Sequence, residues 1–260
     1  MIRIALVTQN EPFYLPPAVE LFCAARGRGV VALIILPAFN EPLIANMRRL
    51  YEFYGPFDFL RLALRFAWAK IASNLNRLGQ ITRPYAIQEV GRKYGIPIYQ
   101  PTNLNGPEFI QVLRDEINPD LLVSLAASQV FKKAVLDVPR LRSINLHSAP
   151  LPRYQGMMPN FWMMLHDEPQ GSVTVHYMAE MLDAGDILAQ LPVPIYPSDS
   201  LQDLIVRSKQ IGVKTLLKVV DQIEAGNARP QPMAIEQATY FSFPKRDDAR
   251  RLRQKGRSLL

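Results

Sequence analysis

The run of residues 121–126 limits the fold of this sequence more than any other segment. It reads Leu-Leu-Val-Ser-Leu-Ala, an apolar stretch without the polar alternation of a strand that has one face in water. Such a strand is typical of a parallel sheet covered by helices on both faces. Two further apolar runs, residues 2–7 and 30–36, flank a helical pattern over residues 19–25. A strand, a helix and a strand in this order predict a βαβ unit, and therefore an α/β fold with a mostly parallel sheet.

The same alternation continues along the chain. We expect helices over residues 84–94 and 107–117, and strands over 96–99, 143–146 and 172–177. Gly95 and Pro119 mark where the two helices stop. Ser200 and Asp203 form a capping-box pattern that opens a helix over residues 201–224, with Gly226 just past its end. We therefore divide the chain into an α/β domain, residues 1–197, and a C-terminal helix with a basic tail, residues 198–260.

Residues 41–80 interrupt the alternation and are interpreted as a helical insertion. Two helical stretches, residues 43–54 and 57–78, are separated by the breaker pair Gly55-Pro56. The second stretch has a wider apolar face than packing on one sheet needs. Plain core covering, a lid on a pocket, a subunit contact in a homodimer and a membrane-surface helix all remain open. Among the functional alternatives we favour a lid or a subunit contact.

Composition narrows the setting in which the protein works. The chain has 260 residues, one cysteine, Cys23, and an N-terminus unlike a signal peptide. We expect a cytoplasmic protein without a transmembrane segment. The formal charge of +7 comes largely from a basic tail over residues 245–257. Such a run is usually a solvated helix, so we expect no nucleic-acid partner.

Two polar residues stand at the end of a predicted strand. Asn145 and His147 are two positions apart, so their side chains point to the same side of the sheet. A stiff loop rich in proline follows over residues 148–159. With three histidines and no paired metal spacing, we expect no metal. His166 is expected in a solvated loop, and His176 is expected to shape a pocket without a catalytic role.

Three motifs occur in order and together resemble the formyltransferases that use 10-formyltetrahydrofolate. Asn-x-His is matched by Asn145 and His147, and Asp-x-Gly by Asp183 and Gly185. Between them, Leu-Pro-x-x-x-Gly-x-x-Pro is matched by Leu151, Pro152, Gly156 and Pro159. The chain departs from the family pattern in the loop, at Ala149-Pro150 and at Gln155. The resemblance implies a Rossmann-like catalytic domain and 10-formyltetrahydrofolate as the formyl donor.

The resemblance assigns catalysis to Asn145, His147 and Asp183. An amine that attacks the formyl carbon places negative charge on the formyl oxygen, which an amide donor and an imidazolium can stabilise. Neutral His147 could instead take the amine proton, and Asp183 could orient it, balance its charge or relay the proton through water. The resemblance further implies that the pterin ring is held largely by backbone groups of two segments, Ser124, Leu125, Ala126, Ala127, Ser128, Gln129, Val130 and Phe131, and Glu180, Met181 and Leu182.

The class of acceptor is inferred mainly by excluding known acceptors of the family. Residues 8–12 lack the Gly-Ser-rich phosphate cradle of family members acting on glycinamide ribonucleotide. Methionyl-tRNA formyltransferases carry a larger C-terminal domain than the residues that follow the motifs here. We therefore expect a small amine, with a nucleotide-linked amino sugar as the leading class. A folate-dependent deformylase, a transferase of a related unit such as carbamoyl, and a non-catalytic basic binding protein remain as alternatives.

Overall fold

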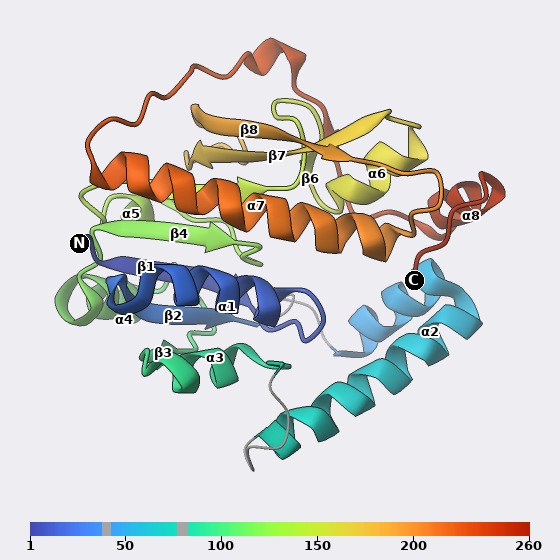
Figure 1. The fold of residues 1–260 in the computed structure, drawn as a ribbon, viewed down its shortest axis with the longest axis horizontal. Coiled ribbons are helices and arrows are strands. Elements are labelled where there is room, and N and C mark those ends of the chain that lie inside the picture. The colour runs from blue at the N-terminus through green and yellow to red at the C-terminus, as the bar shows by residue number, and fades with distance from the viewer. Residues whose placement is uncertain (38–42, 77–82) are drawn as a thin grey trace.

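The computed structural model describes residues 1–37, 43–76 and 83–260 (Figure 1). Within these residues, seven strands form one sheet in the order β3-β2-β1-β4-β5-β7-β8. The first five strands in this order are parallel to one another. At one end of the sheet, β7 is antiparallel to both of its neighbours, β5 and β8. The strands are β1 Ile4–Gln9, β2 Val30–Leu36, β3 Ile98–Tyr99, β4 Leu121–Leu125, β5 Ser143–His147, β7 Gln170–Tyr177 and β8 Ile187–Pro194. The expected mostly parallel α/β fold is confirmed.

Helices cover both faces of this sheet, as the apolar strand pattern requires. Ile4 and Leu6 of β1 belong to one buried cluster, and their neighbours Ala5 and Val7 to another on the opposite face. In Figure 1, α1 and α7 lie in front of the sheet, and α4 and α5 lie behind it. The first face carries α1 Leu15–Arg26, α3 Ile87–Tyr94 and α7 Leu201–Glu224, and the second carries α4 Pro107–Val112, a π-helix Leu113–Ile117 and α5 Lys133–Leu136.

The structure shifts some boundaries and adds elements that the pattern did not predict. The first strand was expected over residues 2–7 but spans Ile4–Gln9, and the helix expected from residue 84 begins at Ile87. The missed elements include β8, α6 Pro159–Leu165 and a small second sheet, in which β6 Gln155–Gly156 pairs with β9 Tyr240–Phe241. The predicted capping box of Ser200 and Asp203 is present at the start of α7.

Helix α7 fixes the position of β5, the strand that carries Asn145 and His147. The helix packs on β5, β7 and β8. A Cβ atom at Gly212 would lie 2.8 Å from Cδ2 of Leu146, so a larger residue there would require the Leu146 side chain to shift. The division of the chain after residue 197 stays a prediction, and α7 contributes residues to the same core as the sheet.

The helical insertion is confirmed as a long bent helix, α2 Leu43–Asn76. The bend lies at Gly55, which has φ 72°, directly before Pro56. Parts of the predicted insertion and the end of its second helix at residue 78 lie outside the described residues. At the end of the first half, the Phe53 ring is buried and contacts the rings of Tyr54, Phe161 and Phe243.

The basic tail forms a helix, α8 Arg246–Gln254, that is docked on the protein along one side. Ala249 and Leu252 are buried, and α8 packs against α2 and α6. Lys255 Nζ donates to the Leu165 carbonyl at 2.8 Å. The basic side chains of α8 thus face outward, and its apolar side chains are buried against the protein.

We predict that Phe53→Ala lowers the free energy of unfolding by about 3–5 kcal/mol, because it leaves a cavity among three aromatic rings. Phe57→Ala in the same helix is the matched control, since the Phe57 side chain is 84% exposed and its loss should cost about 0.5 kcal/mol or less. Urea unfolding of both variants measures the difference. Equal losses would contradict the docking of α2 through Phe53.

Candidate active site

Strand β5 presents Asn145 and His147 on one side of the sheet, as their spacing predicted. The register of the antiparallel partner β7 places His176 opposite Asn145 and Thr174 opposite His147. The Nδ2 atom of Asn145 lies 3.1 Å from Nε2 of His176. The pairing of two strands therefore brings a second histidine into contact with the predicted catalytic asparagine.

Asp183 joins this group from the loop that connects β7 to β8. Its carboxylate is buried, with one oxygen 3.7 Å from Nδ1 of His147 and the other 3.7 Å from Nε2 of His176. The amide of Asn145 approaches the carboxylate at 3.5 Å, and the backbone N–H of Gly156 donates to it at 3.1 Å. The three residues predicted as catalytic thus lie together, with Asn145 and His147 next to the Asp183 carboxylate.

The backbone contacts of the two histidines assign their ring protons. Nε2 of His147 lies 2.8 Å from the Tyr154 carbonyl and must donate to it, which leaves Nδ1 as an unprotonated nitrogen facing Asp183 when the ring is neutral. Nδ1 of His176 donates to the Tyr177 carbonyl at 2.8 Å, so its Nε2 accepts from Asn145. One Asn145 N–H is therefore fixed by His176, and the other is held only weakly by Asp183.

Burial dominates the protonation of His176. It lowers the pKa of this imidazole to about 4, although the nearby Asp183 carboxylate acts in the opposite direction. His176 is therefore neutral at physiological pH and can accept the Asn145 hydrogen bond. The sequence interpretation gave His176 a role in pocket shape, and the structure shows it in direct contact with two of the predicted catalytic residues. The cross-strand register, which the sequence alone did not supply, is the signal that would have found it.

Two glycines of the motifs are required by close backbone approaches. A Cβ atom at Gly185 would lie 1.9 Å from the Tyr177 carbonyl oxygen, and one at Gly156 would lie 2.3 Å from the Phe241 carbonyl oxygen. Asp183 itself has φ 51°, a conformation that few residues other than glycine, asparagine and aspartate adopt readily. The Asp-x-Gly motif is thus a tight turn that carries its carboxylate back to β5.

The loop after His147 is held by side chains from β7 and β8. Thr174 Oγ1 donates to the Ala149 carbonyl at 2.6 Å, and Gln190 Nε2 donates to the Leu151 carbonyl at 2.9 Å. Gln155, the departure from the family pattern, donates through Nε2 to the Asp183 carbonyl at 3.0 Å. Gln155 therefore supports the turn that positions Asp183.

The residues predicted to hold the pterin ring follow β4 and β7. Ser124, Leu125 and Phe131 are buried, whereas Val130, Glu180, Met181 and Leu182 are exposed. Thr8 Oγ1 donates to the Leu125 carbonyl at 2.9 Å, which ties the ends of β1 and β4 together. The remaining predicted residues, Ala126, Ala127, Ser128 and Gln129, are half-buried. Whether these backbone groups bind a ligand stays a prediction.

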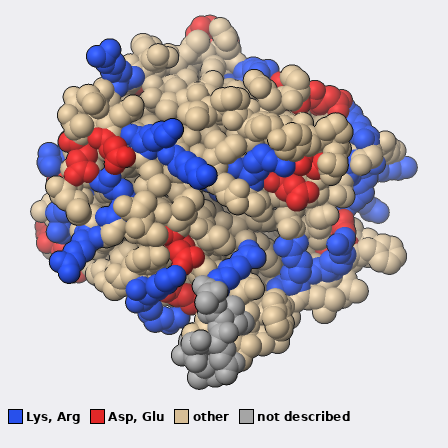
Figure 2. All heavy atoms as spheres, in the orientation of Figure 1, with Lys and Arg blue, Asp and Glu red and all other residues tan. Residues whose placement is uncertain are grey.

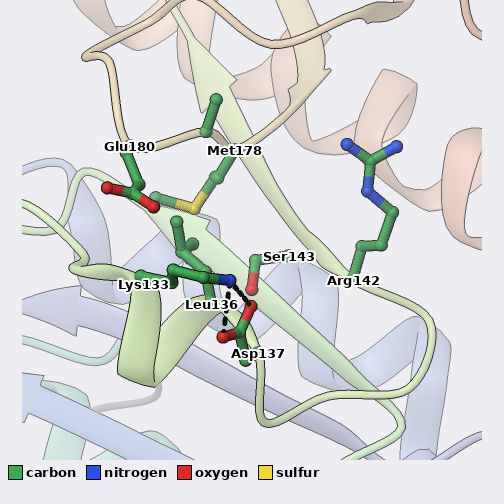
Figure 3. A pocket seen from close by; sticks show the side chains of 8 residues that line it. Lys133, Leu136, Asp137, Arg142, Ser143, Met178 and Glu180 are labelled. Atoms are coloured by element: carbon green, nitrogen blue, oxygen red, sulfur yellow. Dashed lines mark hydrogen bonds and ion pairs between the residues drawn. The ribbon is translucent and has the colours of Figure 1, made fainter.

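A hollow of about 270 Å³ lies between α5, the start of β5 and the loop after β7 (Figure 3). Of the residues predicted to hold the pterin ring, Glu180 alone lines this hollow. The Ser143 hydroxyl is buried there without a hydrogen-bond partner, and Lys133 and Asp137 form an ion pair at 2.8 Å. Sequence reasoning missed this wall, since nothing in the pattern marked Lys133, Leu136, Asp137, Arg142, Ser143, Met178 and Ala179.

Within residues 1–37, 43–76 and 83–260, no group of three or more histidine, cysteine, aspartate or glutamate side chains is placed to hold a metal ion. In the same ranges, no helix has the length and apolar character needed to cross a membrane.

Comparison with known proteins supplies the family. The model of the formyl transferase family matches residues 69–220, more than half of the chain. The chain belongs to the formyl transferase family. The motifs that carry the resemblance, from Asn145 to Gly185, lie inside the matched region.

Curated relatives are methionyl-tRNA formyltransferases. That of Syntrophus aciditrophicus (strain SB) is 39% identical over 155 residues, which cover 60% of this chain and 49% of the relative. That of Geobacillus thermodenitrificans (strain NG80-2) is 37% identical over 168 residues, covering 64% and 52%. The chain thus spans about half the length of the curated relatives it matches.

Solved structures of formyltransferases share the fold. An N-formyltransferase from Helicobacter canadensis, solved with folinic acid and dTDP-3-aminofucose, matches with a TM-score of 0.58 at 17% identity, covering 93% of this chain and 71% of that chain. Glycinamide ribonucleotide transformylase 1 from Symbiobacterium toebii matches with a TM-score of 0.60 at 17% identity, covering 90% and 94%. At these identities the likeness establishes the formyltransferase fold.

We predict that acid destabilises the protein partly through His176. An unfolded histidine titrates near 6.5, so between about pH 6.5 and about pH 4 the unfolded chain binds more protons than the folded one, and stability falls as the pH falls. From about pH 7.5 to about pH 5, this histidine should remove about 2 kcal/mol.

Urea unfolding at a series of pH values measures this effect. His176→Gln should flatten the loss of stability below neutral pH, whereas His166→Gln, at an exposed histidine, should keep the wild-type slope. A wild-type slope in the His176 variant would show that this imidazole is already charged in the folded protein.

Proposed function

We propose that this protein transfers the formyl group of 10-formyltetrahydrofolate to the amine of a small acceptor. The observation that carries the proposal is the convergence of Asn145, His147 and Asp183, together with His176, at the end of β5 in a member of the formyl transferase family. This arrangement supplies a hydrogen-bond donor, a proton acceptor and a buried carboxylate within a few ångströms.

Each of these residues has a role that its contacts support. The weakly held N–H of Asn145 is free to donate to the formyl oxygen as negative charge develops there. Nδ1 of His147, the ring nitrogen that does not donate to Tyr154, takes the proton of the attacking amine, and the Asp183 carboxylate stabilises the imidazolium that forms. His147 then gives this proton to the leaving folate nitrogen. One C–N bond forms and one breaks, and the products are a formamide and tetrahydrofolate.

The donor would be held beside these residues by the loop after β7 and the segment after β4. The hollow at the start of β5 lies beside both segments, since Glu180 of the loop after β7 and Lys133 of α5 line it. Solved neighbours of the same fold carry names that include folinic acid and 5-N-formyltetrahydrofolate. A folate donor is consistent with both observations.

The acceptor is proposed as a small amine, with a nucleotide-linked amino sugar as the first class to test. Several neighbours of the same fold are named as sugar N-formyltransferases. The curated relatives, which have the higher sequence identity, are named for methionyl-tRNA, so this acceptor is the main competitor. A cytoplasmic location and a homodimer stay predictions that accompany the proposal.

We predict that tetrahydrofolate forms from 10-formyltetrahydrofolate only when an amine is supplied. The panel should contain nucleotide-linked amino sugars, free amino sugars, glycinamide ribonucleotide and methionyl-tRNA, with tetrahydrofolate followed by absorbance and formylated products by mass. Release of tetrahydrofolate with free formate and without any amine would identify a deformylase instead. Formylation of methionyl-tRNA alone would replace the small acceptor.

We further predict that His147→Ala, Asp183→Ala and Asn145→Ala each lower turnover by about a hundredfold or more. His166→Ala is the matched control, because this exposed histidine lies outside the group around Asp183 and its loss should leave turnover near the wild-type value. Folate titration should show that the three variants still bind the donor. Near-wild-type turnover in any of them would remove the role assigned to that residue.

A further inference from the structure

The second half of α2 carries an apolar stripe that no described part of the protein covers. Phe57, Leu60, Leu64, Trp68 and Ile71 recur at intervals of three and four residues, and therefore lie on one side of the helix. The exposed fraction of these side chains is 84% for Phe57, 63% for Leu64 and 55% for Trp68. We call these five residues the α2 stripe.

The opposite side of the same helix faces the protein. Ala69 and Ala72 are buried, Arg65 bonds to Gln202 of α7, and Ser73 bonds to Glu89 of α3. The helix is thus anchored by its small and polar side, and the outward direction of the α2 stripe is fixed by packing. A helix that only covered the core would turn its large apolar side chains inward and its polar side chains outward.

Both borders of the α2 stripe are positively charged. Arg61 follows Leu60 and Lys70 precedes Ile71, so at about 100° per residue they lie on opposite sides of the stripe. The one acidic residue between Phe57 and Asn76 is Asp58, which is half-buried and paired with Arg61 and Arg253. The exposed face of this half-helix therefore carries only positive charge.

Helix α8 extends the positive charge from one end of the stripe. It packs on α2 at the bend, where Arg253 bonds to the Tyr54 carbonyl and lies 3.3 Å from Asp58. Its outer side exposes Lys245, Arg246, Arg250 and Arg251 against Asp247. Figure 2 shows basic side chains on the side of the molecule where α2 and α8 lie, with acidic side chains beside some of them.

We propose that the α2 stripe and α8 together bind the surface of an anionic lipid membrane. An apolar helix face with cationic borders and a tryptophan matches the layer between headgroups and acyl chains. A second copy of the chain fits less well for two reasons. Its own positive borders would meet Arg61 and Lys70. Five side chains also form a small patch compared with the roughly 800 Å² that each partner buries in a stable interface. The contact is peripheral and independent of the proposed formyl transfer.

Binding is tested with vesicles of phosphatidylcholine alone and mixed with phosphatidylglycerol. The full chain should float with the mixed vesicles, stay free of the neutral ones, and be released by added salt. Leu64→Ser and the double variant Arg61→Gln, Lys70→Gln should each weaken partitioning about tenfold or more. The matched controls Val206→Ser on α7 and Arg114→Gln, exposed positions elsewhere, should bind like the wild type.

Tryptophan fluorescence locates the contact. The chain has two tryptophans, Trp68 and Trp162. With Trp162→Phe, emission should shift to the blue on mixed vesicles and be quenched by brominated lipid, and with Trp68→Phe this response should be lost. Absent binding, equal binding to neutral vesicles, or a dimer in light scattering that Leu64→Ser dissociates would each overturn the proposal.

Discussion

The arrangement of the candidate site depends on one buried carboxylate, that of Asp183. A charge in this position is costly unless it is compensated, and its neighbours are the Gly156 N–H, the Asn145 amide and the two imidazoles of His147 and His176. These groups come from the loop after β5, from β5 itself and from β7. The turn that carries Asp183 can reach them only because the backbone at Gly185 passes close to the Tyr177 carbonyl. Removing any one of these supports would leave a charged group partly unsatisfied inside the protein.

The two histidines differ in which ring nitrogen is free, because their backbone partners differ. His147 donates to the Tyr154 carbonyl and keeps a nitrogen open toward the carboxylate, so it can exchange a proton. His176 uses its second nitrogen to accept from Asn145, and its low pKa keeps it neutral in that task. In the proposed mechanism, His147 transfers the proton while His176 holds the Asn145 amide in place before substrate arrives. Such preorganisation is where most electrostatic catalysis originates.

Much of this could be predicted from sequence because the relevant signals are local. The apolar run through β4, the breaker pair at Gly55-Pro56 and the spacing of Asn145 and His147 each follow from short-range rules. Asp183 was placed near them only by resemblance, since its approach depends on a turn at positive φ. The contact of His176 depends on strand register, and β8, which contains Pro192 and Pro194, lacks the alternation that marks a strand. The docking of α8 rests on two buried residues within a basic segment, a pattern too short to separate from a solvated helix.

The pairing of β6 with β9 ties the loop that follows His147 to a segment more than eighty residues further along the chain. Thr239 Oγ1 accepts from the Tyr154 N–H at 2.9 Å, the Thr239 carbonyl accepts from Gln155 N–H at 2.8 Å, and the Phe241 carbonyl accepts from Met157 N–H at 2.8 Å. The backbone N–H groups of Tyr154, Gln155 and Met157 therefore lack these partners until residues 239–241 have been made. During synthesis on the ribosome, the loop that supplies the Gly156 N–H to Asp183 gains these three bonds only after residues 239–241 have emerged, so shorter chains lack this support of the site even when their sheet has formed.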